Sequence, residues 1–154
     1  MSDISLASDV QRRLQISLFA LRVTISWFLL QWAVEKMVAP AVTSKIFNVF
    51  YGVTLDVNIA PIIGAIQAIV ILAFLAGFLK TWSYALVAIM HGVSTLATWR
   101  SLVMPFAEGS NHLFTTAVPV LAACAMLFYL RDQDNLFSID ARRALAKDQP
   151  VASA

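Results

Sequence analysis

The fold is decided by residues 21–37, which read LRVTISWFLLQWAVEKM. The stretch belongs to an apolar run from about Leu14 to Met37 that is interrupted by a few polar side chains. Backbone groups in lipid must be hydrogen-bonded within their own segment, so an apolar run of about 20 residues predicts a membrane-spanning helix. The run is too long, and too polar at Arg22 and Gln31, for a signal peptide, which predicts that it is retained.

Three more apolar stretches follow the first one. Each is about 20 residues long, enough to cross a hydrocarbon core of about 30 Å as a helix. The sequence therefore predicts an all-α integral membrane protein, an antiparallel four-helix bundle with both termini on one side. The three stretches are Ile59–Leu79, Trp82–Val103 and Leu113–Leu130.

The composition excludes several classes of protein. Of 154 residues, 60% are hydrophobic and 13% charged, and the mean hydropathy is +0.77, which argues against a water-soluble enzyme. A net charge of +2 is too small to indicate a nucleic-acid-binding surface. The lone Cys124 excludes an internal disulfide and a cysteine-ligated cluster, and it is expected to be an inert small hydrophobe. No nucleotide loop, nucleophile–base pair or metal motif is present, so catalysis would need a bound cofactor or a partner chain.

Positive charges predict the orientation, because loops rich in Lys and Arg stay in the cytoplasm. Lys36 and Lys45 lie on one side, with Arg100 near that end of the third stretch. The seven on the other side predict cytoplasmic termini, a cytoplasmic segment at 1–13, a four-span domain at 14–131 and a cytoplasmic polar tail at 132–154. These seven are Arg12, Arg13, Lys80, Arg131, Arg142, Arg143 and Lys147.

The connections between the stretches are unequal. The segment from Pro40 to Asn58 is long and partly apolar, which predicts a short interfacial helix. The turn at Lys80 and Thr81 is short, which predicts an antiparallel hairpin of the second and third helices. A short helix is expected in the tail at about 140–147.

Polar side chains inside apolar spans are costly and therefore mark candidate sites, although they also serve as glue between helices. Arg22 lies about 12 Å into the first helix at 1.5 Å per residue. The sequence offers no acidic residue at its depth within a span. Two interpretations stay open for Arg22: a structural one, with hydrogen bonds inside the bundle or to lipid phosphate, and a direct role in binding a ligand.

A second group of polar side chains is expected in the outer half of the bundle. Gln31 and Glu35 are four residues apart and so share a helix face. At 1.5 Å per residue, Gln67 lies about 12 Å and Arg100 about 6 Å from the outer edge, and Asn111 and His112 directly precede the fourth stretch. We predict an ion pair between Glu35 and Arg100, which is either structural or part of a ligand or proton site.

The two histidines head polar stripes at helical spacing. His91 leads Ser94, Thr95 and Thr98, and His112 leads Thr115, Thr116 and Pro119. The stripes either bond neighbouring helices or line a headgroup pocket or a water path. His91 and His112 differ in depth by about 15 Å at 1.5 Å per residue, which argues against a haem between them. Pro119 predicts a kink in the fourth helix.

Residues 14–131 resemble the DoxX-type small membrane proteins. The opening helix carries an Arg and, fourteen residues later, a Lys, here Arg22 and Lys36. The second stretch has Gln67, Gly77 and Lys80 at places similar to an acidic residue, a Gly and a basic turn residue of that family. The chain departs from the pattern at Gln67, where the family has Glu, and at Trp32 and Ala33, where a Gly is expected.

The resemblance implies a four-helix protein of the bacterial inner membrane, some of whose relatives are subunits of quinone-linked oxidoreductases. We therefore expect an accessory or anchoring subunit of a respiratory or oxidoreductase membrane complex. The alternatives are a quinone-interacting subunit and a small carrier or channel. Expected partners are the bilayer and other membrane subunits. No covalent cofactor and no metal is expected, and quinone is the candidate ligand. The candidate ligand-binding residues are Arg22, Gln31, Glu35, Gln67, His91, Arg100 and His112.

Overall fold

The computed structural model describes residues 2–147, and every regular element within them is a helix. The four apolar stretches correspond to the four longest helices, α1, α3, α4 and α6. The elements in chain order are α1 (Ser2–Val38), α2 (Pro40–Tyr51), α3 (Ala60–Leu75), α4 (Lys80–Ala97), α5 (Trp99–Val103), the 3₁₀ helix η1 (His112–Thr116), α6 (Ala117–Tyr129) and α7 (Ile139–Lys147).

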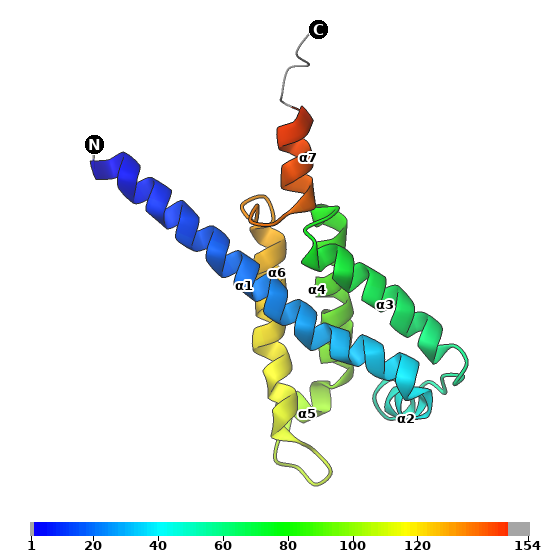
Figure 1. The fold of residues 1–154 in the computed structure, drawn as a ribbon. Helices are drawn as coiled ribbons and strands as arrows, with labels where there is room; N and C mark the ends of the chain where they lie inside the picture. Colours follow the sequence, from blue (N-terminus) through cyan, green and yellow to red (C-terminus); the bar gives the residue numbers. More distant parts are fainter. Residues whose placement is uncertain (1, 148–154) are drawn as a thin grey trace, which may run out of the picture.

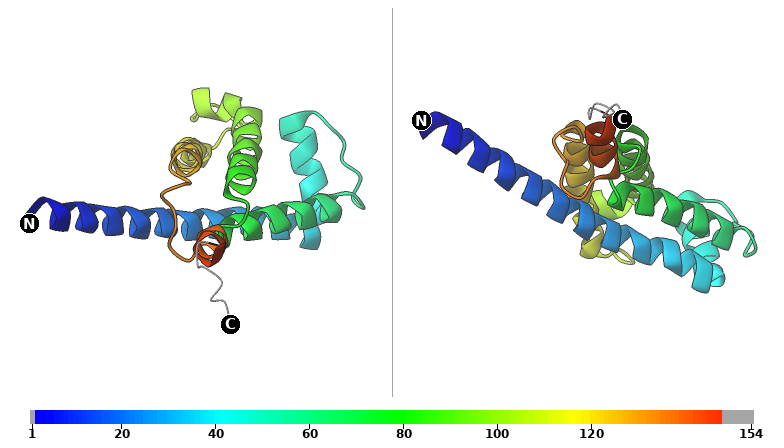
Figure 2. Two further views of the ribbon diagram at one scale, coloured as in Figure 1. Left: turned by 90° about the horizontal axis from the view of Figure 1, so that it is seen from above. Right: turned by 45° about the horizontal axis from the view of Figure 1, so that its top comes forward.

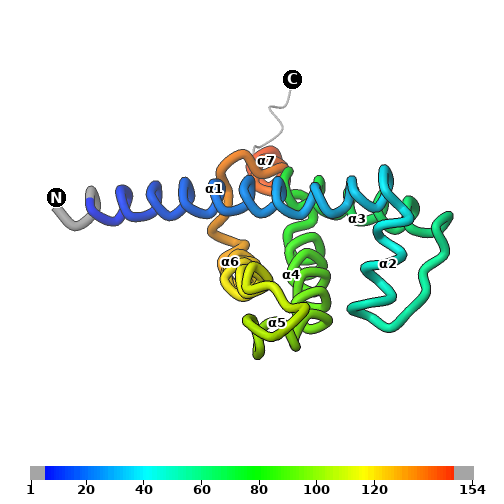
Figure 3. The backbone as a smooth tube through the Cα atoms, turned by 90° about the horizontal axis from the view of Figure 1, so that it is seen from below, coloured from blue at the N-terminus to red at the C-terminus, as the bar shows by residue number. Residues whose placement is uncertain are grey.

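The long helices form two packed pairs. α1 packs chiefly against α3, and α4 packs chiefly against α6 (Figure 1). α4 and α6 lie on one side of α1 and run across its axis (Figure 2). Figure 3 shows α2 on that same side of α1, and shows the first turns of α1 projecting beyond the other helices.

The hairpin predicted for the second and third stretches opens at its turn. α3 and α4 are joined by residues 76–79, as the short connection predicts. However, α3 packs along α1, whereas α4 packs along α6. Gly77 and Leu79 both have positive φ angles, 60° and 47°, which swing the chain sharply. The side chains of Arg22 and Ser138 fill the corner beside Gly77.

Successive long helices alternate in direction. In Figure 1, α1 and α4 run away from the end of the molecule where α7 lies, and α3 and α6 run back toward it. The start of α1 and the whole of α7 therefore lie at one end, and α2 and α5 lie at the other. The alternation agrees with the predicted helix order, whereas the crossing of the two pairs departs from a simple antiparallel bundle.

Two of the predicted helices are modified by the structure. The third stretch breaks at Thr98, whose hydroxyl donates to the carbonyls of Ser94 and Thr95, and Arg100 consequently lies on the separate short helix α5. Pro119, at which a kink was predicted, does not lie in the interior of an α-helix. The backbone changes from η1 to α6 at Thr116, and Pro119 lies in the first turn of α6, where its missing N–H costs no helical bond.

Apolar side chains are mostly outside and several polar ones are inside. Trp27, Ile69, Trp82 and Leu96 are each about 70% exposed, at 69%, 68%, 71% and 71%. A small apolar core joins α1, α3, α4 and α6. The buried polar side chains are Arg22, Ser26, Thr43, Ser83, His91, Thr95, Asp134 and Ser138.

Two helical segments in the described chain are long and apolar enough to cross a membrane, Leu6–Val38 and His112–Tyr129. α3 is apolar but shorter, with 16 residues. The structure therefore supports the membrane prediction by length and composition for two segments.

α1 and α3 approach each other closely at Gly64. A Cβ atom there would lie 2.6 Å from the carbonyl oxygen of Ala33 and 2.9 Å from Cβ of Lys36. Ala33 and Ala60 are buried at the same contact, 1% and 0% exposed. Ala60 and Gly64 are four residues apart, which is the spacing of small residues that lets two helices in a membrane pack closely. The sequence carried this signal in α3.

Candidate functional site

The arginine cluster, which consists of Arg22, Tyr84 and Asp134, is the most completely buried polar group of the described chain. Arg22 and Asp134 are 0% exposed and Tyr84 is 1% exposed. Arg22 Nη1 lies 3.2 Å from Asp134 Oδ2 and donates to the Tyr84 hydroxyl at 3.1 Å. The hydroxyl in turn donates to Asp134 Oδ2 at 2.7 Å. The cluster thus joins α1, α4 and the segment after α6.

Backbone oxygens complete the cluster on its C-terminal side. Arg22 Nη2 donates to the carbonyl of Leu136 at 2.7 Å and to that of Phe137 at 3.5 Å. Phe137 has a φ of 51°, a left-handed conformation that costs a residue with a side chain about 1–2 kcal/mol. Hydrogen bonds to a guanidinium are among the strong ones, at about 1.5–3 kcal/mol each, so they can sustain this conformation. Arg22 Nε and Asp134 Oδ1 have no hydrogen-bond partner among the described residues.

The start of α7 is docked on the turn between α3 and α4. The Ser138 hydroxyl donates to the carbonyl of Gly77 at 3.0 Å, and the amide of Asp140 donates to the same carbonyl at 3.1 Å. Asp140 Oδ2 accepts from the amide of Lys80 at 2.9 Å and so caps the N-terminus of α4. A Cβ on Gly77 would lie 2.8 Å from Arg22 Nη1, so this position requires glycine for both its φ and its space.

Lys80 belongs to the same end of the molecule. Its Nζ donates to the carbonyl of Asp134 at 3.3 Å and to Asn135 Oδ1 at 3.0 Å. Partial burial lowers the pKa of Lys80, and the neighbouring carboxylates of Asp134 and Asp140 oppose that change. Lys80 is thus, after Arg22, the second cationic side chain that binds the segment containing Asp134.

The partner of Arg22 was not predicted from the sequence. No carboxylate lies at the depth of Arg22 within a span, and Asp134 comes from the tail, which folds back after Tyr129. The signal that could have found it is the acidic pair Asp132 and Asp134 directly after an apolar helix, on the side where Arg22 enters the bundle. Arg22 therefore has the surroundings expected of a structural residue that is hydrogen-bonded inside the protein.

Gln31 and Glu35 lie together in an open groove on the outside of α1. The groove has a volume of about 320 Å³ and is lined by Phe28, Gln31, Trp32 and Glu35, which we call the α1 groove. Neither the Gln31 amide nor the Glu35 carboxylate forms a hydrogen bond or an ion pair with a described residue. The predicted pairing of Gln31 and Glu35 on one face is confirmed.

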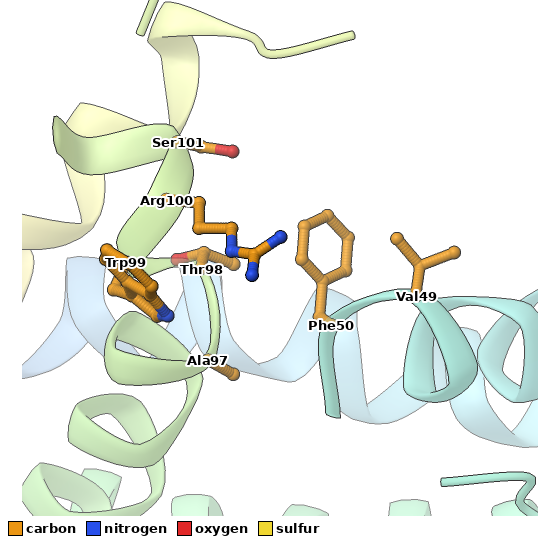
Figure 4. Close-up of a pocket in the computed structure, with 7 residues that line it drawn as sticks. All are labelled: Val49, Phe50, Ala97, Thr98, Trp99, Arg100 and Ser101. Atoms are coloured by element: carbon orange, nitrogen blue, oxygen red, sulfur yellow. The ribbon is translucent and has the colours of Figure 1, made fainter. Parts of the chain in front are cut away.

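Arg100 lies in a different place, the Arg100 pocket of about 500 Å³ between α2 and α5 (Figure 4). Its guanidinium points toward Phe50 and lies 5.7 Å from the ring centre of Trp99. Thr98 and Ser101 also line the pocket, with Val49 and Ala97. The predicted ion pair of Glu35 with Arg100 is wrong: no such pair exists among the described residues, because the break at Thr98 moves Arg100 onto α5.

The other candidate residues are dispersed. His91 is buried, with Nε2 3.0 Å from the carbonyl of Ala117 on α6, and its ring lies edge-on to Phe28. His112 is exposed and stacks on Phe106. Gln67 is half-buried on α3 and makes no side-chain hydrogen bond with a described residue. The convergence of Gln67, Arg100 and His112 on one outer site is not observed.

The polar stripes differ in the same way. In α4, His91 and Thr95 face inward, and the exposed Ser94 accepts from the hydroxyl of Tyr51 on α2 at 3.1 Å. In the fourth stretch, Thr115 and Thr116 are exposed and bond only to carbonyls three residues back. The first stripe thus contributes to packing between helices, and the second does not. Cys124 is buried and free, as predicted.

Comparison with known proteins finds no matching family model, no similar curated protein and no similar solved structure. The resemblance to DoxX-type proteins therefore rests on the residues quoted for it. The arginine cluster, the α1 groove and the Arg100 pocket are the sites from which a function has to be argued.

Proposed function

We propose that the protein is a four-span integral membrane protein with both termini in the cytoplasm, which acts as an accessory or anchoring subunit of a membrane complex. Support for the spans comes from the many exposed tryptophan, isoleucine and leucine side chains, together with the burial of the charged pair Arg22 and Asp134. In water such a surface would be an aggregation liability, whereas lipid covers it at no cost. The alternating direction of α1, α3, α4 and α6 fits four crossings (Figure 1).

The role as a subunit rests on one observation, the α1 groove. Gln31 is exposed and Glu35 is partly exposed on a helix whose neighbouring side chains Trp27 and Trp32 are 69% and 47% exposed. An amide that faces hydrocarbon without a partner is costly, and so is a carboxylate whose one charged neighbour is Lys36, the next residue along the helix. A polar group on a helix of another chain would remove that cost, as interhelical hydrogen bonds do in membrane assemblies. The redox character of the complex is what the resemblance implies.

A second candidate function is a quinone-interacting subunit that uses the same groove. Phe28 and Trp32 supply flat apolar walls, and Gln31 supplies N–H donors for a quinone carbonyl. Of the candidate ligand-binding residues, Gln31 and Glu35 are the ones that line this groove. The small-molecule content of the purified protein distinguishes this candidate from the first one.

Site-specific photocrosslinking in native membranes tests the proposal. A photoreactive residue at Gln31 should give one adduct with another membrane protein, identified by mass spectrometry. The matched control is Ile69 of α3, which is 68% exposed and does not line the α1 groove. A photoreactive residue at this position should react with lipid only. Adducts at Gln31 with lipid alone would contradict the subunit role.

Two further outcomes are informative. An adduct of Gln31 with a second copy of this chain would make the groove a self-association surface and would contradict an accessory role. A stoichiometric quinone that is lost in Gln31→Leu but kept in Ile69→Leu would favour the second candidate.

A further inference from the structure

We infer that the Arg100 pocket is a binding site for a phosphate group carried by an amphiphilic ligand, the headgroup phosphate of a phospholipid. The inference goes beyond the proposed function and rests on its membrane setting. It starts from an arginine that the described chain leaves without a counterion. The guanidinium of Arg100 makes no ion pair and no hydrogen bond with a described residue, and it lies 5.7 Å from the ring centre of Trp99.

The donors of the pocket suit a tetrahedral anion. A guanidinium presents five N–H donors in a planar fork that matches two phosphate oxygens at once. The hydroxyl of Ser101, one residue further along α5, forms no hydrogen bond with a described residue. Figure 4 shows the Arg100 and Ser101 side chains on the same side of α5, facing the space in front of α2. A phosphate in this space would receive two donors from Arg100 and one from Ser101.

The opposite wall of the pocket is apolar. Val49 and Phe50 of α2 line it, and Val49 is 73% exposed. A ligand held by its phosphate at Arg100 would lay an apolar portion against these two side chains. The volume of about 500 Å³ is within the range of about 300–1,000 Å³ usual for small-molecule sites. An inorganic ion would leave the apolar wall unused, which is why an amphiphile fits better.

No acidic side chain of the described residues neutralises Arg100. Lys45 on α2 is exposed at the same end of the molecule. The acidic residues of that end are Glu35, in the α1 groove, Glu108, which is exposed in the loop before η1, and Asp56. Asp56 accepts from the amide and the side chain of Asn58, and none of the three pairs with Arg100. In the proposed orientation this end lies at the outer surface of the membrane, at the level of headgroup phosphates.

Lipid retention measured by native mass spectrometry tests the site. The protein is released from micelles doped with phosphatidylglycerol or with diacylglycerol, which has the same chains but no phosphate. We expect the wild type to retain phosphatidylglycerol and not diacylglycerol. Arg100→Gln should reduce retention at least about tenfold, and Ser101→Ala, which keeps the arginine, about three- to tenfold. Arg12→Gln, an exposed arginine at the opposite end, should behave as wild type.

A calorimetric titration with inorganic phosphate separates the two sources of the same chemistry. Binding of free phosphate that Arg100→Gln abolishes would keep the phosphate site and assign it a soluble ligand. Equal retention of phosphatidylglycerol by wild type, Arg100→Gln and Ser101→Ala would overturn the inference. Flotation with vesicles after an alkaline wash is done first. A protein that fails to float contradicts the proposed membrane role. A protein that floats, but whose retention of phosphatidylglycerol does not depend on Arg100, contradicts this inference alone.

Discussion

Two arginines in apolar segments of this chain have opposite surroundings. Arg22 is 0% exposed and bonds to a carboxylate, a hydroxyl and two carbonyls, whereas Arg100 is exposed and has no counterion among residues 2–147. At the end that contains Arg22, the chain itself supplies the counterion. The end that contains Arg100 and the α1 groove leaves a guanidinium, an amide and a carboxylate unused. A charged residue in a membrane helix therefore indicates an external ligand only after the chain's own partners have been searched.

The largest effect is expected from removing the counterion of Arg22. Asp134→Asn leaves a buried guanidinium without its charge partner, and such a loss costs about 3–5 kcal/mol. Thermal unfolding in detergent micelles, followed by circular dichroism, would measure it. Asp132→Asn is the matched control, since the side chain of Asp132 is 77% exposed and should contribute at most about 0.5 kcal/mol.

Replacing both partners sharpens this prediction. Arg22→Met with Asp134→Leu removes the charges together and should recover a large part of the loss, because apolar side chains of similar size replace buried ion pairs at little cost. If Asp134→Asn unfolds no earlier than Asp132→Asn, the arginine cluster does not hold this end of the molecule together.

The half of α1 that carries the groove is held by close packing, not by charge. Gly64→Ala places a Cβ 2.6 Å from the Ala33 carbonyl oxygen and should cost about 1–3 kcal/mol. Gly92→Ala is the matched control in α4, because its Cβ would meet only Leu121 Cδ1 at 3.6 Å. That change should be neutral or stabilising, since alanine favours helix over glycine. Unfolding of the two variants in micelles compares them, and equal stability would contradict the close approach of α1 and α3.

A smaller effect is expected from the hydroxyl of the arginine cluster. Tyr84→Phe keeps the ring, which lies 4.7 Å from that of Phe74 between ring centres, and removes the bonds to Arg22 and Asp134. The loss of stability should be about 1–2 kcal/mol. Tyr129→Phe, in which the exposed side chain is 75% accessible, serves as the control and should change the unfolding temperature little. A Tyr84→Phe protein as stable as wild type would show that the hydroxyl does not contribute.

The smallest effect is expected from the outer charges. Glu35→Gln and Arg100→Gln should each change stability by no more than about 0.5 kcal/mol. Their double-mutant cycle should show no coupling beyond about 0.5 kcal/mol, in contrast to the Arg22–Asp134 cycle. A coupling of more than about 1 kcal/mol between Glu35 and Arg100 would mean that this end of the molecule, like the end with Arg22 and Asp134, contains an interacting charged pair.

The sequence was sufficient for the positions of the helices and insufficient for how they meet. Apolar runs located α1, α3, α4 and α6, and the mixed segments located α2 and α7. The break at Thr98 was missed because side chain to backbone bonds compete with the helix locally and leave hydropathy unchanged. The crossing of the two helix pairs depends on the turn at Gly77 and on what fills it.

The candidate site was predictable only in part. The face shared by Gln31 and Glu35 follows from helical spacing alone, and the structure has it. The partner of Arg22 lies 112 residues away in the chain, in a segment that composition describes as a polar tail. The Glu35–Arg100 pair was predicted from depth along a helix. Depth does not say in which direction around the helix axis a side chain points, and it does not reveal that α4 ends at Ala97, before Arg100.

The distance in sequence between Arg22 and Asp134 sets an order of events during biosynthesis. A ribosome adds about 5–20 residues per second, so the 112 residues that separate the two take about 6–22 s to synthesise. Throughout that interval the newly made first helix carries a cation whose carboxylate has not been translated. A segment made late in translation thus neutralises the cation of a helix made early, and a chain truncated before Asp134 keeps the Arg22 guanidinium without its carboxylate.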